Sequence, residues 1–495
     1  MDMMHTIKDG NRESASGVPF QKSEHDFTLI IFGASGSLAK LKLFPSIYQL
    51  HLEKRTPKDF KVIGYARTPL SQEAFIEEFK DAVRAKFKDN TDEKILDAVA
   101  KNVSYVSGQY DVKADYADLK KHLAHTEGVN KNRIRLAYLS TPPSVFDAVI
   151  RQLGQINFNT TLGKLRLIIE KPFGHNLKTA KYLETVLKRK FDHDQVFLLD
   201  HYLGKEPVFN LLSLRYANPI LTSLIHGQYI DNIQVNGLES LGTEGRAGYF
   251  DSVGSLRDMV QSHLFQILAF LTMDLPTKIT SDSIHRAKRK LIESLSIRDI
   301  KRSVVRGQYQ GYLKEAGVEP ESKTETFTSL RLFINEKNWR NVPIYLRTGK
   351  KLTQQLTSVV IEFKPQEVQK NNKKLQPNKL IIQLQPFERI EFHLLTKMGG
   401  SEIDFVPLNT GKPIYCSGDC LDEHSRLILE AIKGDKMLFL EFPEIYAAWK
   451  VIDKITGYFE KNNPPLEGYE PGSYGPKGAA PLLKKGIQWH NTHAS

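Results

Sequence analysis

The feature that most constrains the fold is a short apolar run at residues 27–32, which stops abruptly at Gly33. The run, FTLIIF, is almost continuously apolar, as is typical of a strand that is buried on both faces of a parallel sheet. A segment with helical spacing follows at 38–52, and a second apolar run follows at 60–65. Strands that alternate with helices predict a doubly wound α/β domain, because parallel neighbours need a crossover connection.

The alternation continues as far as residue 200. It predicts further elements of the same domain, namely a helix over 71–87 and strands at 133–139, 165–169 and 195–199. We therefore expect a Rossmann-like, dinucleotide-binding domain over residues 25–200. The segment 1–24 mixes charged residues with Gly and Ser and has no apolar stretch of the kind found in signal peptides, so a flexible start is expected.

Beyond residue 200 the periodicity changes. A long helical segment is predicted over 253–273, and the segments after it alternate apolar and polar residues. This period of two predicts the strands of an antiparallel sheet at 326–334, 358–363, 379–384 and 389–394. We therefore expect a second, larger α+β domain over 201–495, with a mainly antiparallel sheet.

The formal net charge of +12 raises the question of a nucleic-acid partner. The basic residues form short, dispersed patches without the interleaved aromatic residues that stack on bases, so no nucleic acid is expected. A positive field suits small anionic molecules equally well. No uninterrupted apolar stretch of about 18 residues occurs in the sequence, so we expect no membrane association and a cytoplasmic location.

Only two cysteines, Cys416 and Cys420, occur in the 495 residues. Their C-x3-C spacing is compatible with a redox pair or with half of a metal site, but no second Cys or His pair completes such a site. We therefore expect two ordinary cysteines, no metal ion and no disulfide framework, which fits a reducing compartment.

The segment after the first predicted strand, Gly33-Ala34-Ser35-Gly36-Ser37-Leu38-Ala39, is rich in small residues. Glycines at a strand-to-helix junction allow a tight turn and let backbone N–H groups approach a pyrophosphate at the helix N-terminus. The spacing is G-x-x-G-x-x-A rather than the usual G-x-G-x-x-G, so a purely structural turn is an alternative interpretation.

The second predicted strand ends in Gly64-Tyr65-Ala66-Arg67. A NAD site usually has Asp or Glu at the end of this strand, where the carboxylate binds the ribose hydroxyls. An arginine binds a 2′-phosphate instead and favours NADP. On these residues alone, a surface arginine at a strand end stays the alternative.

Residues 200–205 read Asp-His-Tyr-Leu-Gly-Lys and follow the last predicted strand of the first domain. If a helix begins here, His201 and Lys205 share one face and close on an anion beside the helix N-terminus. Tyr202 adds a hydroxyl donor. A helix start with incidental polar residues is the alternative.

Two further segments carry candidate residues. Lys171 directly follows a predicted strand, at the sheet edge where α/β proteins bind ligands. His263 falls on or beside the apolar face of the helix predicted over 253–273, where a lone histidine is more often a core residue. That helix also bears Asp258, and Asp200 is available at a strand end. A carboxylate that fixes the histidine in one tautomer would make it a competent general base for a sugar hydroxyl.

Together these segments resemble the glucose-6-phosphate dehydrogenase family. The resemblance is carried by motifs in collinear order: GASGSLAK (33–40), GYAR (64–67), EKPFGH (170–175), DHYLGKE (200–206), GTEGRAGYFD (242–251), LRDMVQSH (256–263), RTGK (347–350) and YEPGSYGP (469–476). It spans about residues 27–485, and DHYLGK and EKPFG are highly specific.

The resemblance implies oxidation of glucose 6-phosphate to 6-phosphogluconolactone with hydride transfer to NADP, the first step of the oxidative pentose phosphate pathway. It implies His263 as the general base and Asp200 as the carboxylate that orients it. The implied substrate-binding residues are Lys171, His201, Tyr202, Lys205, Glu239, Asp258, Lys350 and Gln385. The implied cofactor-binding residues are Gly33, Ala34, Ser35, Gly36, Ser37, Leu38, Ala39, Lys40, Arg67 and Lys171, with a cis peptide bond before Pro172. The family is typically dimeric or tetrameric, so a homodimer or homotetramer is expected.

The chain departs from the family pattern at several positions. Ser37 stands where Asp is usual, and Gln355 replaces a cation that is common five residues after Lys350. Losing that cation is expected to weaken substrate binding by about 1.5–3 kcal/mol. Gln383 replaces an arginine that some members use for a second, structural NADP, so no second nucleotide is expected. Residues 285–288 read HRAK instead of the usual RDEK, a change without an explanation in the sequence.

Two other functions stay open at this point. Ser37 and Gln355 would suit a related dehydrogenase of broader hexose-phosphate or NAD-accepting specificity. A catalytically impaired homologue that senses nucleotide or binds a partner is disfavoured, because all the implied catalytic positions are intact.

Overall fold

The computed structural model describes residues 22–128, 132–366, 375–399, 405–414 and 420–491. The chain forms two compact units that are interleaved along the sequence. The first unit lies within Met1–Lys171, Leu183–Glu206 and Tyr415–Phe439, and the second lies within Pro172–Tyr182, Pro207–Ile414 and Leu440–Ser495. The domain boundaries predicted from the sequence, after residues 24 and 200, stay a prediction.

The first unit is built on a six-stranded sheet in the order β3-β2-β1-β4-β5-β6, and every neighbouring pair is parallel. Its strands are β1 (Asp26–Phe32), β2 (Phe60–Ala66), β3 (Val103–Ser107), β4 (Arg133–Leu139), β5 (Arg166–Glu170) and β6 (Val196–Leu199). All residues of β1 after Asp26 are buried, which explains the continuous apolar run. The predicted doubly wound domain is confirmed, although β3 was not predicted.

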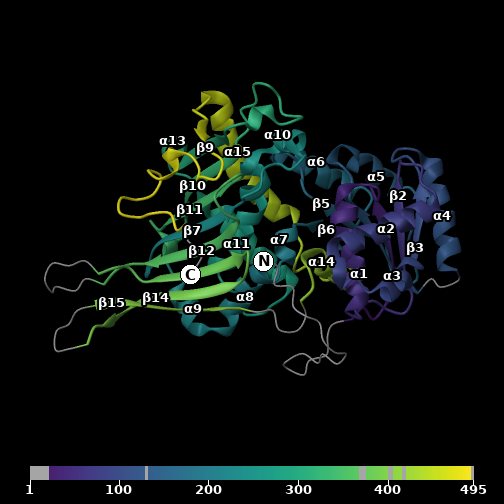
Figure 1. Cartoon of the computed structure of the whole chain (residues 1–495), viewed down its shortest axis with the longest axis horizontal. Coiled ribbons are helices and arrows are strands. Elements are labelled where there is room, and N and C mark those ends of the chain that lie inside the picture. The colour runs from purple at the N-terminus through teal and green to yellow at the C-terminus, as the bar shows by residue number, and fades with distance from the viewer. Residues whose placement is uncertain (1–21, 129–131, 367–374, 400–404, 415–419, 492–495) are drawn as a thin grey trace. The chain divides into compact units, whose positions relative to one another are not determined.

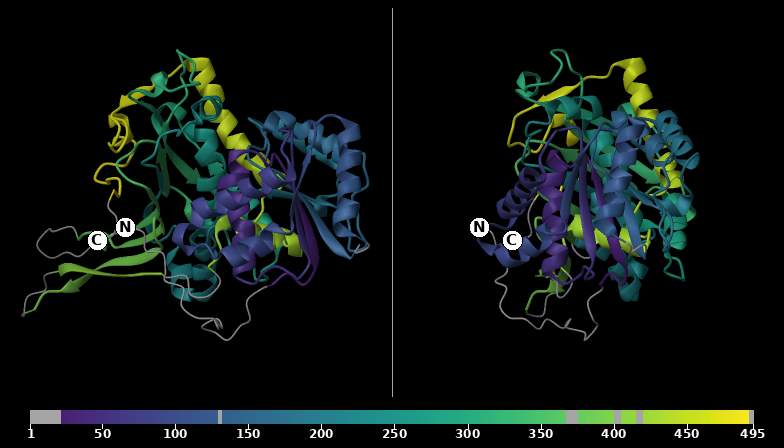
Figure 2. Two further views of the ribbon diagram at one scale, coloured as in Figure 1. Left: turned by 45° about the vertical axis from the view of Figure 1, so that its right-hand side comes forward. Right: turned by 90° about the vertical axis from the view of Figure 1, so that its right-hand side faces the viewer.

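Helices cover both faces of this sheet (Figure 2). One face carries α1 (Phe44–Leu52), α2 (Gln72–Phe87) and α3 (Glu93–Ala100), which pack against one another, and the other carries α4 (Lys113–Glu127) and α5 (Phe146–Leu153). A further helix, α14 (Glu423–Lys433), comes from much later in the chain. It packs against α1, β4 and the short helix α7 (His201–Gly204).

The second unit carries a ten-stranded sheet in the order β15-β14-β13-β12-β7-β11-β10-β9-β16, with β8 paired to β10. Its strands are β7 (Ile230–Leu238), β8 (Leu295–Ser296), β9 (Val304–Tyr309), β10 (Phe327–Ile334), β11 (Pro343–Gly349), β12 (Leu356–Phe363), β13 (Lys379–Gln385), β14 (Arg389–Lys397), β15 (Phe405–Pro413) and β16 (Glu467–Tyr469). The pairs β7–β11 and β9–β16 are parallel and the others are antiparallel, so the predicted mainly antiparallel sheet is confirmed. The ribbon β14–β15 projects from this sheet (Figure 1).

The single helix predicted over 253–273 is interrupted near its start. It consists of α10 (Ala247–Ser255), the π-helix η5 (Leu256–Leu264) and α11 (Phe265–Thr272). Gly254 has φ 74° and ψ 165°, and a Cβ at this residue would lie 2.7 Å from Oε1 of Glu325. The same oxygen accepts a hydrogen bond of 3.1 Å from the N–H of Leu256. The chain therefore breaks at Gly254, and the buried Glu325 carboxylate caps the segment that follows.

A buried carboxylate explains the departure at residues 285–288. His285 and Lys288 lie on α12 (Ser281–Ser294), and both contact Glu444 on α15 (Phe442–Asn462). Nδ1 of His285 is 3.1 Å from Oε1 of Glu444, and Nζ of Lys288 is 3.1 Å from Oε2. Burial disfavours the charge of Glu444, but these two side chains outweigh it and lower its pKa. The HRAK segment thus links α12 to α15 through a charge cluster that is almost wholly buried.

Two further expectations can be compared with the structure. In the described part of the chain, no helix is both long and apolar enough to cross a membrane. Cys420 is disulfide-bonded, which corrects the expectation of ordinary thiols, whereas Cys416 lies outside the described residues.

Candidate active site

The carboxyl ends of the strands in the first unit carry most of the predicted functional residues. Because all six strands are parallel, these ends share one edge of the sheet. The small-residue loop follows β1 at Gly33, Arg67 follows β2, Lys171 follows β5 and Asp200 follows β6. Ligands of open α/β sheets bind at this edge, so the fold brings the predicted nucleotide and phosphate residues to one side.

The loop after β1 has the geometry of a tight strand-to-helix turn. Gly33 has φ +84°, and a Cβ at this residue would lie 2.5 Å from the carbonyl oxygen of Ser140. Its N–H donates to the carbonyl oxygen of Tyr65 at 2.8 Å, and the chain is helical from Ser37 onward. Only glycine fits this combination of positive φ and close backbone approach. The helix N-terminus behind the loop suits a pyrophosphate.

Arg67 lies beside this loop. Its guanidinium carbon is 5.4 Å from the ring centroid of Tyr110, and its side chain is exposed. The next residue, Thr68, has its hydroxyl 3.1 Å from the hydroxyl of Ser35 in the loop. A cation and two hydroxyls thus lie at the end of β2, which suits a phosphorylated ribose. Tyr110 and Thr68 were not predicted from the sequence, since neither belongs to a recognised motif.

Lys40, the last residue of the loop motif, forms an ion pair with Glu78, which the sequence did not indicate. Its Nζ is 2.9 Å from Oε2 of Glu78 on α2, and both side chains are about a third exposed. Such a solvent-exposed pair contributes little stability, about 0–1 kcal/mol. Lys40 is therefore free in energetic terms to exchange this carboxylate for an anionic ligand.

The helix expected from residue 200 is only one turn long. Asp200 is its N-cap, because Oδ1 accepts a hydrogen bond of 3.0 Å from the N–H of Tyr202. The helix ends at Gly204, and Lys205 is extended, with φ −71° and ψ 125°. His201 and Lys205 therefore do not share a helix face, which corrects the prediction. Instead, Nζ of Lys205 lies 3.8 Å from the ring centroid of Tyr202, a cation–π contact.

α14 supports this short helix. A Cβ on Gly204 would lie 2.6 Å from the carbonyl oxygen of Glu423 and 2.8 Å from Cδ1 of Leu427. The guanidinium of Arg426 donates to the carbonyl oxygen of Gly204 at 3.3 Å and also forms an ion pair with Glu206. The glycine of the DHYLGK motif is therefore required by a helix that lies more than two hundred residues later in the chain.

A buried histidine of α14 lies between two of the predicted motifs. His424 is 3% exposed, its Nε2 is 3.6 Å from Glu170, and its Nδ1 is 3.6 Å from Glu423. Its ring stacks on that of His201, with centroids 6.3 Å apart. Burial opposes the imidazolium charge, but the two carboxylates outweigh it and raise the pKa of His424 to about 9. Tyr138 donates to Glu170 at 2.6 Å and fixes that carboxylate.

In the second unit, two predicted sugar-binding residues meet directly. Glu239 follows β7 and Lys350 follows β11, and these two strands are parallel neighbours, so both residues emerge at the same edge. Nζ of Lys350 is 2.8 Å from Oε2 of Glu239. The hydroxyl of Tyr469 donates to the carbonyl oxygen of Lys350 at 2.7 Å, so the YEPGSYGP motif fixes the backbone at this position.

The helical segment with the predicted base packs against the same two strands. η5 contacts β7 and β11, and the close approach occurs at Gly237, where a Cβ would lie 3.1 Å from Leu264. His263, in the last turn of η5, is 1% exposed, as its place beside the apolar face predicted. Asp258 is half-buried in the first turn. Gln385 ends β13, and its Oε1 accepts a hydrogen bond of 3.0 Å from Thr357.

The structure groups the predicted residues into two sets. The first unit contains the nucleotide loop, Arg67, Lys171 and the segment 200–205, and the second contains the residues from Glu239 onward. Asp200 and His263 belong to different units, so their pairing stays a prediction. The cis peptide expected before Pro172 is not found, because in the described chain the cis peptide is Gln385–Pro386.

Comparison with known proteins identifies one enzyme family for nearly the whole chain. The NAD binding domain of glucose-6-phosphate dehydrogenase matches residues 30–210, and the C-terminal domain of glucose-6-phosphate dehydrogenase matches residues 212–490. The chain belongs to the glucose-6-phosphate dehydrogenase family. It therefore contains a nicotinamide dinucleotide-binding domain of that family.

Individual relatives cover nearly the whole chain. Glucose-6-phosphate 1-dehydrogenase of Schizosaccharomyces pombe is 36% identical over 92% of this chain and 93% of its own length. The enzyme of that name from Bacillus subtilis is 35% identical over 94% of this chain and 98% of its own length. A solved structure, glucose-6-phosphate dehydrogenase in complex with its substrate glucose-6-phosphate, is 33% identical and covers 96% of this chain and 100% of its own, with a TM-score of 0.85.

Proposed function

We propose that this chain oxidises glucose 6-phosphate to 6-phospho-D-glucono-1,5-lactone with hydride transfer to NADP. The observation that carries the proposal is the match to both domains of one enzyme family, together with the family motifs placed at strand ends. Its predicted partner is the small-molecule substrate, with no nucleic acid and no membrane. A cytoplasmic homodimer or homotetramer is the expected form.

We infer that His263 is the general base and that Asp200 orients it. The imidazole takes the proton of the C1 hydroxyl while C1 loses its hydride, so that a C=O bond replaces the C–O–H group. A deeply buried histidine with a carboxylate partner is suited to this step, since the ion pair stabilises the imidazolium that forms. When bound, NADP supplies the acceptor for the hydride.

Phosphate recognition is assigned to the segment after β6. His201 stacks on the buried cation His424, whose charge is partly offset by Glu170 and Glu423, and Lys205 adds an ammonium group to the same segment. A positive, partly buried site favours a phosphate dianion. The remaining sugar contacts are assigned to Lys171, Glu239, Asp258, Lys350 and Gln385. Lys350 and Glu239 already pair with each other, which orients both for hydroxyl groups.

Cofactor binding is assigned to the edge formed by β1 and β2. The loop from Gly33 to Lys40 would bind the pyrophosphate, and Arg67 would bind the 2′-phosphate, so NADP is the proposed cofactor. The proposal includes no metal ion and no second, structural nucleotide. The absence of a second nucleotide is proposed because residue 383 is a glutamine and offers no cation. Gln383 is buried, and its Nε2 donates to the carbonyl oxygen of Phe387 at 3.1 Å. We also propose residues 25–200 as the cofactor domain and 201–495 as the domain for substrate binding and oligomerisation.

Steady-state rates test this function. Initial rates are measured with NADP and with NAD, and with glucose 6-phosphate and with free glucose. We expect the highest kcat/KM with glucose 6-phosphate and NADP. Equal rates with free glucose would contradict the phosphate site. Equal kcat/KM for NAD and NADP, or for several hexose phosphates, would favour a dehydrogenase of broader specificity. Ser37 and Gln355, which depart from the family pattern, are the residues that suggest this alternative.

A further inference from the structure

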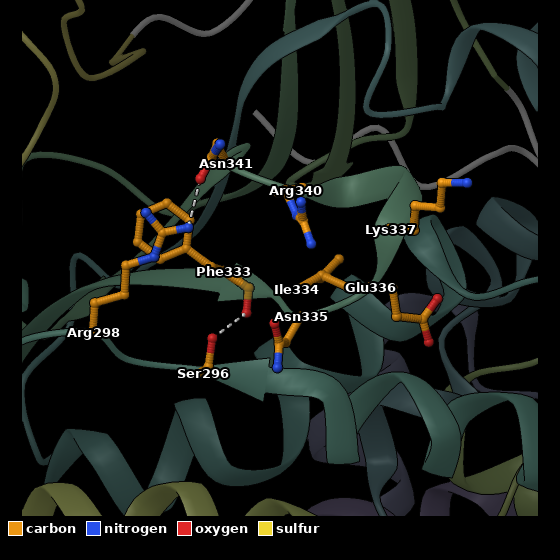
Figure 3. Close-up of a pocket in the computed structure, with 9 residues that line it drawn as sticks. All are labelled: Ser296, Arg298, Phe333, Ile334, Asn335, Glu336, Lys337, Arg340 and Asn341. Carbon is orange, nitrogen blue, oxygen red and sulfur yellow. Dashed lines mark hydrogen bonds between the residues drawn. The ribbon is translucent and has the colours of Figure 1, made fainter.

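A small pocket of about 140 Å³ lies in the second unit, and none of the residues assigned to catalysis lines it. It is formed by β8, by the end of β10 and by the segment that follows, which includes the one-turn helix η7 (Lys337–Trp339). Figure 3 shows the side chains around it. Its polar lining consists chiefly of Arg298, Asn335, Glu336, Lys337, Arg340 and Asn341.

The charge of this pocket is unbalanced. Its lining contains three cations and one carboxylate, so the formal charge is +3 − 1 = +2. The carboxylate, Glu336, is itself 3.7 Å from Nζ of Lys290, outside the lining. Among the described residues, no ion pair is formed by Arg298, Lys337 or Arg340. Cations that line one pocket with too few carboxylates to balance them repel one another, and a bound anion relieves this repulsion.

One of the cations is held in a fixed orientation. The guanidinium of Arg298 lies 3.9 Å from the ring centroid of Phe333, and it donates to Oδ1 of Asn341 at 2.8 Å. Stacking and a hydrogen bond together restrict the rotamers of this long side chain, so less entropy is lost when it binds a ligand. Figure 3 shows the guanidinium of Arg340 pointing into the pocket from the side of η7. The guanidinium groups of Arg298 and Arg340 thus border one cavity, and contacts with Phe333 and Asn341 hold that of Arg298 in place.

We propose that this pocket binds a phosphate-type oxyanion, either inorganic phosphate or the phosphoryl group of a small metabolite. Planar guanidinium groups match the oxygen atoms of a phosphate through paired, charge-assisted hydrogen bonds. The amide of Asn335 adds a neutral donor, and the cavity volume matches an ion of this size rather than a nucleotide. The site goes beyond the proposed dehydrogenase activity and does not depend on it.

Equilibrium dialysis with radiolabelled inorganic phosphate tests the proposal, with the full-length chain. The proposed substrate-phosphate site would also bind this ion, so it is first weakened by Lys205→Gln, and the part of the remaining binding that depends on Arg298 and Arg340 is assigned to the pocket. In that background, Arg298→Gln with Arg340→Gln is expected to weaken phosphate binding at least about tenfold. The matched control is Arg286→Gln, an exposed cation on α12 that is expected to leave binding unchanged.

Three outcomes are distinguished. Loss of binding in the Arg298/Arg340 variant, but not in the control, supports the pocket. A tenfold tighter binding of glycerol 3-phosphate than of inorganic phosphate identifies a metabolite as the ligand, and equal or weaker binding identifies the inorganic ion. Binding that is the same with and without Arg298 and Arg340 would overturn the proposal. The same two substitutions in the otherwise wild-type chain are expected to leave dehydrogenase activity within about twofold, so failure of the pocket and failure of the proposed function are separable.

Discussion

The rings of His201 and His424 stack with centroids 6.3 Å apart and planes 13° apart. His201 belongs to the segment assigned to substrate phosphate, whereas His424 belongs to α14. Since His424 also contacts Glu170 at the end of β5, one buried side chain connects the ends of two neighbouring strands. α14 therefore holds in place the segment 200–205, to which phosphate binding is assigned.

The close contact between α14 and Gly204 predicts the effect of a single methyl group. We expect Gly204→Ala to lower stability by about 1–3 kcal/mol and to raise KM for glucose 6-phosphate, because the added Cβ would lie 2.6 Å from the carbonyl oxygen of Glu423. Urea denaturation and steady-state kinetics measure the two effects. The control is Gly457→Ala in α15, where no atom lies within 4 Å of the added Cβ. It is expected to be neutral or stabilising. Equal effects of both substitutions would contradict the role of α14.

The charge of His424 predicts a pH-dependent stability. Its pKa is raised from 6.5 to about 9 in the folded chain, so its stabilising contribution is complete below pH 6.5 and is lost as the pH rises to about 9. The shift corresponds to about 3 kcal/mol. The charged groups around it are Glu170 on β5 and Glu423 on α14, with Lys42 paired to Glu423 at 2.8 Å.

The measurement is the midpoint of urea denaturation at pH 6.5 and at pH 9. The wild-type midpoint is expected to fall over this interval, and His424→Gln is expected to flatten the dependence while lowering the midpoint at pH 6.5. His193→Gln, at an exposed position of the same unit, is the control and should keep the wild-type slope. An unchanged slope in His424→Gln would show that this imidazole is neutral in the folded chain.

The sequence predicted the motifs of this site but not the elements behind them. The apolar run of β1 and the residues after β1, β2, β5 and β6 are local signals, and the structure places these residues at one edge of the sheet. His424 gave no such signal, because its partners Glu170 and His201 lie more than two hundred residues away in the chain. The expectation that His201 and Lys205 share a helix face was wrong, since α7 ends at Gly204 and Lys205 is extended.

In the second unit, too, features that depend on residues distant in sequence were not predicted. Four of its strands, β10, β12, β13 and β14, were predicted from their period of two. The central strand β7 was not predicted, because it is buried along nearly all its length and does not alternate. The break at Gly254 depends on Glu325, which is distant in sequence. The HRAK segment at residues 285–288 likewise pairs with Glu444, which lies far from it in sequence, so no local pattern explains it.

That buried cluster predicts a non-additive response to substitution. Glu444→Leu is expected to lower stability by about 3–5 kcal/mol, because it leaves the ammonium group of Lys288 buried without its partner. Lys288→Met combined with Glu444→Leu is expected to recover a large part of this loss, since both charges are then absent. A double-mutant cycle by urea denaturation measures the coupling. Strictly additive effects would mean that the two charges do not interact.

The place of Arg67 at the end of β2 predicts the cofactor preference. Arg67→Ala is expected to reduce kcat/KM for NADP about tenfold or more and to leave kcat/KM for NAD nearly unchanged, because only NADP carries the 2′-phosphate. Lys54→Ala, at an exposed cation beyond α1, is the control. A parallel loss with both cofactors would show that Arg67 supports the fold rather than the phosphate.

The most direct test of the account compares wild-type chain and His263→Asn with glucose 6-phosphate and NADP, by the initial rate of NADPH formation. We expect an active wild-type chain and a variant at least about a hundredfold slower, with an unchanged circular dichroism spectrum and KM for glucose 6-phosphate within a few fold. A wild-type chain that forms no NADPH, or a variant with undiminished rate, would contradict the assignment of this chain as a dehydrogenase with His263 as its base.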